Sequence, residues 1–221
     1  ANTKAYVVEA TADARYAKAR NSGVPKKIGR HLVLFDCLTC DKCVPVCPND
    51  ANFTYAVPRG EVPVVKLRRE GDSWTSRTEG SLRFDKKHQL ANFADFCNEC
   101  GNCDVFCPED GGPYVVKPRF FGTHDLWAQA KDRDGFFLER KGGAETVSGR
   151  FSGLEYSLTL RDGEADYAGP GFRVSYKPAD PAGTMRGSAE GEVDLTYALI
   201  MDLLRRALFA PDAVSYVNAG Q

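Results

Sequence analysis

Apolar residues in the last hundred positions of the chain recur at two different periods. Every second residue is apolar between positions 153 and 160, which predicts a β-strand with one buried face. Asp162-Gly163 favours a tight turn, and alternation returns at 172–176, so a small antiparallel sheet is expected. A helix packed on this sheet is predicted from apolar residues at helical spacing, namely Leu195, Leu199 and Leu203, with Ile200, Leu204 and Leu208 beside them.

The pattern before residue 120 is more broken. Residues 1–30 predict a helical extension, because Ala, Lys and Arg are frequent in its second half. Short strands are expected at 31–35 and 51–57, where apolar residues cluster or alternate. Residues 114–116 are also apolar and predict a strand that echoes 51–57, so two similar halves are expected.

An insertion at about residues 60–87 separates these halves. Residues 62–69 and 74–84 predict a hairpin across a polar turn at 70–73. The hairpin is basic, with Lys66, Arg68, Arg69, Arg77, Arg83, Lys86 and Lys87. It either docks an acidic partner or is a decorated surface hairpin, and the sequence favours neither.

All eight cysteines belong to two copies of one spacing. Two-residue gaps let a tight loop direct three sulfurs at three corners of a cube, and soft thiolates suit iron and inorganic sulfide. The spacing is typical of bacterial-type ferredoxins, which hold iron–sulfur cubanes. The copies are Cys37-x2-Cys40-x2-Cys43-x3-Cys47-Pro48 and Cys97-x2-Cys100-x2-Cys103-x3-Cys107-Pro108.

Disulfides and structural zinc are the alternative uses for these cysteines. A disulfide framework rarely repeats a 2-2-3 spacing, and the N-terminus has no signal-peptide pattern that would send the chain to an oxidising compartment. Zinc sites usually pair two Cys-x2-Cys units across a longer gap. Two [4Fe-4S] clusters are therefore the favoured prediction, and neither copy lacks a cysteine.

In two-cluster ferredoxins the fourth cysteine of each run binds the cluster of the other run. Transferred to this sequence, that exchange predicts cluster I on Cys37, Cys40, Cys43 and Cys107. It predicts cluster II on Cys97, Cys100, Cys103 and Cys47. Every iron then has a protein ligand and no corner is open to substrate, so the clusters are expected to carry electrons and not to catalyse.

Composition excludes several other functions. The chain of 221 residues is 43% apolar and 27% charged, with a formal net charge of −1 and no basic patch suited to nucleic acid. No apolar run approaches the roughly 18 residues of a membrane span, so a cytoplasmic protein without a membrane partner is expected. Neither a glycine-rich dinucleotide loop nor a Walker-type loop is present. His31, His88 and His124 are isolated, so we expect no catalytic residue in this chain.

The residues around the cysteines carry a more specific resemblance. Residues 34–49 (LFDCLTCDKCVPVCPN) and 92–110 (NFADFCNECGNCDVFCPED) resemble the C-terminal two-cluster ferredoxin region of the selenate reductase flavoprotein family. Larger members of that family are NAD(P)H oxidoreductases similar to the glutamate synthase small subunit, with FAD- and NAD(P)-binding domains before the iron–sulfur part. The resemblance implies a flavoprotein domain or subunit as partner, including one fused upstream, and a terminal reductase or oxidase. This chain departs from the family because it has no flavin or nucleotide domain.

The sequence thus predicts an α+β protein with three parts. They are a helical extension (1–30), a bacterial-type 2[4Fe-4S] ferredoxin domain with an inserted hairpin (31–119), and an appended antiparallel sheet plus helix (120–221). The expected function is an electron-transfer module of a flavin-linked oxidoreductase, which relays single electrons. The alternatives are a freely diffusing ferredoxin and a structural or redox-sensing domain held together by its clusters.

Overall fold

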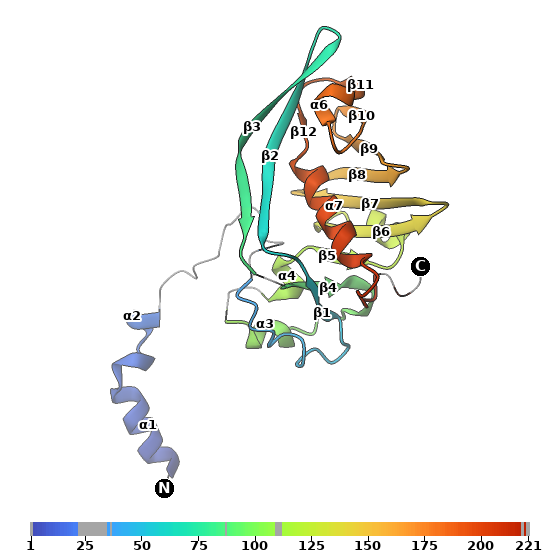
Figure 1. The fold of residues 1–221 in the computed structure, drawn as a ribbon. Helices are drawn as coiled ribbons and strands as arrows, with labels where there is room; N and C mark the ends of the chain where they lie inside the picture. The colour runs from blue at the N-terminus through green and yellow to red at the C-terminus, as the bar shows by residue number, and fades with distance from the viewer. Residues whose placement is uncertain are drawn as a thin grey trace.

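The computed structural model describes residues 2–21, 35, 37–86, 88–108, 112–217 and 219. It confirms the mixed α+β class, with two β-sheets and one long packed helix (Figure 1). The larger sheet has nine strands in the order β1-β4-β5-β6-β7-β8-β9-β10-β11, and the smaller has the order β12-β2-β3. Except for Phe35, the strand predicted at 31–35 lies outside the described residues.

The strands of the larger sheet come from both sides of residue 119. They are β1 (Asn52–Ala56), β4 (His88–Phe93), β5 (Arg119–Phe121), β6 (Gly135–Lys141), β7 (Ala144–Phe151), β8 (Leu154–Arg161), β9 (Glu164–Gly169), β10 (Phe172–Tyr176) and β11 (Arg186–Ala189). β1 and β4 flank the cysteine motifs and pair antiparallel, and β5 then joins β4 to β6 by parallel pairing. The sheet is therefore continuous across residue 119, where the sequence predicts a domain boundary.

Strands β6 to β10 form an antiparallel meander with short turns. Three of these turns have two residues at positive φ, namely Gly142-Gly143, Ser152-Gly153 and Asp162-Gly163. Such turns match the twist of the flanking strands, which explains why Gly, Ser and Asp occupy them. The predicted strand at 153–160 and the turn at 162–163 are confirmed, and the meander is larger than the sequence prediction.

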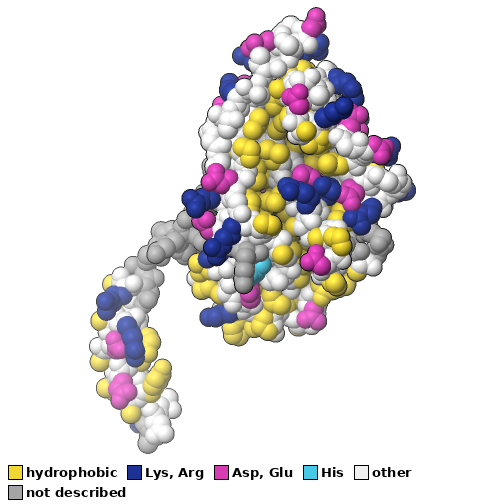
Figure 2. Space-filling model, viewed as in Figure 1, with side chains coloured by type: hydrophobic (Ala, Val, Ile, Leu, Met, Phe, Trp, Pro, Cys, Tyr) yellow, Lys and Arg dark blue, Asp and Glu magenta, His cyan; other side chains and the backbone are white. Residues whose placement is uncertain are grey.

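The inserted hairpin is also present as predicted. β2 (Gly60–Glu70) and β3 (Ser73–Phe84) pair antiparallel around Gly71 and Asp72, and β12 (Val193–Asp194) pairs with the other edge of β2. The hairpin extends as a ribbon along the larger sheet (Figure 1). On the face drawn in Figure 2, apolar side chains form a band beside this ribbon.

Most cations of the hairpin have carboxylate partners within the chain. Glu79 lies 2.7 Å from the Lys66 ammonium and 2.8 Å from the Arg77 guanidinium, which also lies 2.9 Å from Glu192. Arg83 pairs with Asp85 at 3.1 Å. Lys87 lies outside the described residues. Docking of an acidic partner stays a prediction, and these pairs leave less free positive charge than the sequence indicates.

The long helix α7 (Thr196–Leu208) packs between the two sheets. Ile200, Met201, Leu204 and Leu208 are fully buried among aromatic residues of both sheets. Leu199 and Leu203 belong to the edge of this face and are only partly buried. The helix is confirmed. Its fully buried residues include Ile200, Leu204 and Leu208, which were predicted to lie beside the main apolar face, so the buried face is shifted by about one residue.

The remaining helices are short, except at the N-terminus. They are α1 (Asn2–Ala12), a 3-10 turn (Ala14–Tyr16), α2 (Lys18–Asn21), a 3-10 turn (Ala94–Phe96), α3 (Asn102–Phe106), α4 (Pro113–Val116), α5 (His124–Gln129) and α6 (Pro181–Thr184). α1 lies within the predicted helical extension at 1–30 but begins before its Ala-, Lys- and Arg-rich part, and it buries no residue.

The strand predicted at 114–116 is wrong, because these residues form α4. Pro113 stands at the first helical position, where its fixed φ and missing N–H suit a helix start. Lys117 N donates to Pro113 O at 3.0 Å and closes the turn. The strand of this half follows instead as β5, and the two halves are less similar than expected.

Candidate iron–sulfur centre

The two cysteine motifs share left-handed backbone conformations at equivalent positions. Thr39 and Glu99 occupy equivalent positions, sixty residues apart, and have φ of 54° and 56°. Asp41 and Gly101 are the next equivalent pair, with φ of 57° and 83°. Three of these four residues are not glycine, so their positive φ angles are strained. Strain of this kind persists where the surrounding structure imposes it. Alternating left-handed residues turn successive N–H groups toward one side, where a cluster's sulfurs would lie.

Hydrogen bonds repeat in the two motifs as well. Val44 N donates to Asp41 O at 3.1 Å, and the equivalent Asp104 N donates to Gly101 O at 3.0 Å. The fourth cysteine of each motif closes a further turn, with Cys47 N and Cys107 N each 3.2 Å from its acceptor oxygen. Burial also matches: Cys43 and Cys103 are buried, whereas Cys40 and Cys100 are exposed. The repeated spacing therefore has a structural counterpart, residue by residue.

One small cavity is lined by the fourth cysteine of the first motif and by three cysteines of the second. It is lined by Cys97, Cys100 and Cys103 and also by Cys47, which is fifty residues earlier in the chain than Cys97. Asn52 of β1, Asn92 of β4 and Tyr114 of α4 complete much of its wall. The β1–β4 pairing makes this possible, because it joins the end of the first motif to the start of the second.

The Cys43 thiol of the first motif is buried, and its environment disfavours the thiolate when no metal is bound. Burial raises the pKa of Cys43 to about 12, and the thiols of Cys37, Cys40 and Cys107 add to the rise. The cavity thus brings Cys47 to the second motif, and the division of the eight cysteines into two sets of four, each with three members from one motif and one from the other, stays a prediction.

The chemistry of these sets fits [4Fe-4S] clusters. All eight cysteines are free thiols, and main-chain N–H groups already approach two sulfurs: Thr39 N lies 3.3 Å from Cys37 Sγ and Ala51 N lies 3.2 Å from Cys47 Sγ. Hydrogen bonds of this kind tune the reduction potential of a bound cluster. Among the residues described, no three His, Cys, Asp or Glu side chains converge as the ligands of a single metal ion do. A cubane spans more space, because each iron takes its own thiolate.

Two asparagines tie the strands to the first motif. Asn52 Nδ2 donates to Cys43 O at 3.0 Å, and Asn92 Nδ2 donates to Asn52 Oδ1 at 2.9 Å. Both side chains are almost fully buried. Neither asparagine is among the residues predicted from the sequence, although polar residues at the cysteine-proximal ends of two apolar strands are a usable signal.

Charged residues contact the two loops in different ways. His88 Nε2 lies 3.0 Å from Oδ1 of Asp41 in the first loop, so this histidine is not isolated as the sequence suggested. In the second loop, Glu99 accepts a 2.7 Å hydrogen bond from the buried Arg119, which holds the pKa of that carboxyl below its usual range. Arg119 also donates to Tyr114 O at 2.9 Å. The first loop is therefore contacted by a histidine and the second by an arginine.

Aromatic residues near the motifs have varied positions. Tyr114 lines the cavity of the second set, whereas Phe53 and Tyr55 pack against Phe120 with ring centroids 6.1 Å and 5.9 Å away. Phe106 is exposed. These four rings, which follow or interrupt the motifs in sequence, do not form one shell around the cysteines. His31 lies outside the described residues, and His124 packs on Trp127 away from the cysteines.

Comparison with known proteins agrees with this geometry. The 4Fe-4S dicluster domain family matches residues 33–110. This match supports an iron–sulfur region with an electron-transfer role, and the relatives described next support an oxidoreductase. "Putative oxidoreductase YgfK" of Escherichia coli (strain K12) is 37% identical over 100 residues, which are 45% of this chain and 7% of that protein. The protein of the same name from Escherichia coli O157:H7 gives the same values.

This chain therefore aligns with only 7% of the length of these curated relatives. No solved structure matches it. Across the described part of the chain, none of the helices has the length and apolar character needed to cross a membrane.

Proposed function

We propose that this chain relays single electrons through two [4Fe-4S] clusters with exchanged ligands. Cluster I is held by Cys37, Cys40, Cys43 and Cys107, and cluster II by Cys97, Cys100, Cys103 and Cys47. The observation that carries the proposal is the cavity in which Cys47 joins the three leading cysteines of the second motif. When bound, each cluster supplies one-electron redox chemistry, and the protein supplies the ligands, N–H groups and surrounding charges.

We also propose a flavoprotein partner, as a separate subunit or as a domain of a longer polypeptide. A cluster moves one electron at a time, so exchange with NAD(P)H needs a flavin to divide a hydride pair. The sequence has no dinucleotide-binding loop. Support comes from the resemblance to the selenate reductase flavoprotein family and from relatives that are named oxidoreductases and are much longer. The terminal reaction belongs to that partner or to a third protein.

Single-cysteine variants test the ligand exchange directly. We expect Cys47→Ser to give the same EPR change as Cys97→Ser, because both remove a ligand of cluster II. Cys107→Ser should instead match Cys37→Ser. The proteins are purified anaerobically, assayed for iron and sulfide, and compared as dithionite-reduced samples. If Cys47→Ser reproduces the Cys37→Ser spectrum, the exchanged assignment is wrong.

Reduction of the wild-type protein tests the role as a relay. Both clusters should accept one electron each when the protein is titrated with dithionite, and both should be reoxidised reversibly. Clusters that stay oxidised at the lowest accessible potential, while the protein remains folded, would favour a structural role instead.

A further inference from the structure

Two buried asparagines belong to one half of the repeated cysteine region and not to the other. Asn92 of β4 and Asn52 of β1 both line the cavity that Cys47 shares with the second motif, the cysteine cavity. The equivalent positions in the sequence, sixty residues away, are Leu32 and Gly112, and neither residue carries a side-chain amide. The asparagine pair therefore breaks the symmetry between the two halves.

The side-chain amide of Asn92 uses only part of its hydrogen-bonding capacity. Asn92 is 1% exposed, and its Nδ2 donates one proton to Asn52 Oδ1 at 2.9 Å. An amide nitrogen carries two protons, and the described residues supply no acceptor for the second. Asn92 Oδ1 has no partner among them either. Buried polar groups are nearly always hydrogen-bonded, so the occupant of the cavity is expected to complete this set.

Asn52 fixes which end of the Asn92 amide is the donor. Asn52 and Asn92 are register partners in the β1–β4 pair, and Asn52 Nδ2 donates to Cys43 O at 3.0 Å. That bond leaves Asn52 Oδ1 as the atom presented to Asn92. Exchange of oxygen and nitrogen in the Asn92 amide would place two acceptors against each other. The main-chain oxygen of Cys43 thus sets the direction of both amides.

A [4Fe-4S] cluster can use only one of the two unpaired groups of Asn92. The sulfurs of a cluster accept hydrogen bonds and donate none, so the N–H is the group that suits them. Hydrogen bonds to these sulfurs are one of the factors that set the reduction potential of a cluster. They stabilise the negative charge that reduction adds, and the potential rises.

We propose that Asn92 donates its second amide proton to a sulfur of cluster II and thereby raises the reduction potential of that cluster. This inference rests on the proposed relay with exchanged ligands. Reduction adds one electron, supplied by the flavoprotein partner, and the amide proton stays on nitrogen. Asn92 is not an iron ligand, so its replacement should shift the potential without removing the cluster.

An EPR-monitored redox titration of the anaerobically purified protein tests the proposal. Asn92→Leu removes the amide at similar side-chain size. At a fixed potential it should lower the ratio of reduced to oxidised cluster II about tenfold, which is about 59 mV for a one-electron couple. The potential of cluster I should not change. Asn92→Gln keeps an amide and should recover part of the shift. The signal of cluster II is identified by its loss in Cys97→Ser.

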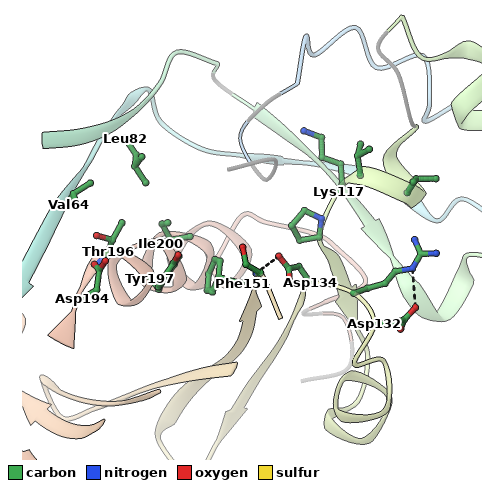
Figure 3. A pocket seen from close by; sticks show the side chains of 15 residues that line it. Val64, Leu82, Lys117, Asp132, Asp134, Phe151, Asp194, Thr196, Tyr197 and Ile200 are labelled. Atoms are coloured by element: carbon green, nitrogen blue, oxygen red, sulfur yellow. Dashed lines mark hydrogen bonds and ion pairs between the residues drawn. The ribbon is translucent and has the colours of Figure 1, made fainter. Parts of the chain in front are cut away.

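Two buried polar residues outside the cysteine cavity serve as controls. Gln89 is three positions from Asn92 on β4, so it lies on the opposite face of the strand, and its amide has no partner in the part of the chain described. Thr196 lines a separate cavity of about 750 Å³ between the hairpin and α7 (Figure 3), and its hydroxyl is also unpaired among the described residues. Gln89→Met and Thr196→Val should leave both potentials unchanged.

Isotope labelling tests the contact in the wild-type protein. Asparagine that carries the heavy nitrogen isotope in its side-chain amide should give an electron spin echo modulation from reduced cluster II, and Asn92→Gln should abolish it. No such coupling in the wild type, a coupling that persists in Asn92→Gln, or a wild-type potential in Asn92→Leu overturns the proposal. The labelled wild type decides if Asn92→Leu fails to bind clusters. EPR signals from both reduced clusters of the wild type separate this failure from failure of the relay.

Discussion

Gly112 is the position where one added methyl group should disturb both clusters. A Cβ atom at this residue would lie 2.5 Å from Asp104 Cα, 2.6 Å from Asp104 N and 2.9 Å from Asp104 Cβ. Asp104 belongs to α3, between Cys103 and Cys107, which we assign to different clusters. It also binds the Gly112 amide, with its Oδ1 atom 2.7 Å from Gly112 N. Gly112→Ala should therefore displace the helix that carries ligands of both clusters.

The size of the effect follows from the overlap. Non-bonded carbon atoms normally approach to about 3.5–4.0 Å, so the new methyl group must move by about 1 Å relative to Asp104. Overpacking typically costs about 1–3 kcal/mol. We expect about 3 kcal/mol here, because the clash is with backbone atoms that no side-chain rotation can remove. Gly191 is the control: a Cβ there meets nothing within 4 Å, so Gly191→Ala should change stability by less than about 0.5 kcal/mol.

Anaerobic urea unfolding followed by circular dichroism measures the stability difference. Iron content and EPR spectra of the same preparations report the clusters. We expect Gly112→Ala to unfold at lower urea than Gly191→Ala and to lose signal from both clusters. A Gly112→Ala protein with wild-type stability and both signals intact would refute the role assigned to this contact.

Two further predictions concern buried arginines. Arg150 is 1% exposed and donates to the carbonyl oxygens of Ala130 and Arg133 at 2.8 Å and 3.0 Å. Arg150→Met should therefore lower the free energy of unfolding, measured with urea, by about 3–5 kcal/mol. A loss below about 1 kcal/mol would contradict this. Arg119→Gln should lower the reduction potential of cluster II, because it removes a cation and leaves Glu99 less compensated, whereas Glu99→Gln should raise that potential. EPR-monitored redox titration measures both, and equal shifts in cluster I would show that the effect is not local.

Local signals in the sequence carried the correct predictions. The repeated cysteine spacing predicted [4Fe-4S] clusters, which the match to the 4Fe-4S dicluster domain family supports, whereas the cluster that each cysteine binds stays a prediction. Alternation bounded by Asp162-Gly163 located β8 and its turn, and helical spacing located α7. The same turn chemistry at Gly142-Gly143 and Ser152-Gly153 would have revealed β6 and β7, because residues at positive φ mark tight hairpins.

Other features depend on contacts that no local pattern contains. The parallel pairing of β5 with β4 and β6 joins segments that are far apart in sequence, and three residues are too few to signal a strand. The contact of His88 with Asp41 spans 47 positions. The helix at Pro113–Val116 was misjudged for a different reason, since apolar residues alone do not separate a short strand from a helical turn.

The parallel pairing also explains why so large a C-terminal region accompanies the cysteine motifs. Asn92 of β4 is the register partner of Arg119 of β5, and the two side chains make different contacts near the cysteines. Asn92 lines the cysteine cavity, and Arg119 holds Glu99 of the second loop. β5 continues into β6, which is fixed in turn by the antiparallel meander and α7. The core of the C-terminal sheet therefore holds the second loop in place through the contact of Arg119 with Glu99, whereas the first loop has Thr39 at the equivalent position and so offers no carboxylate to an arginine there.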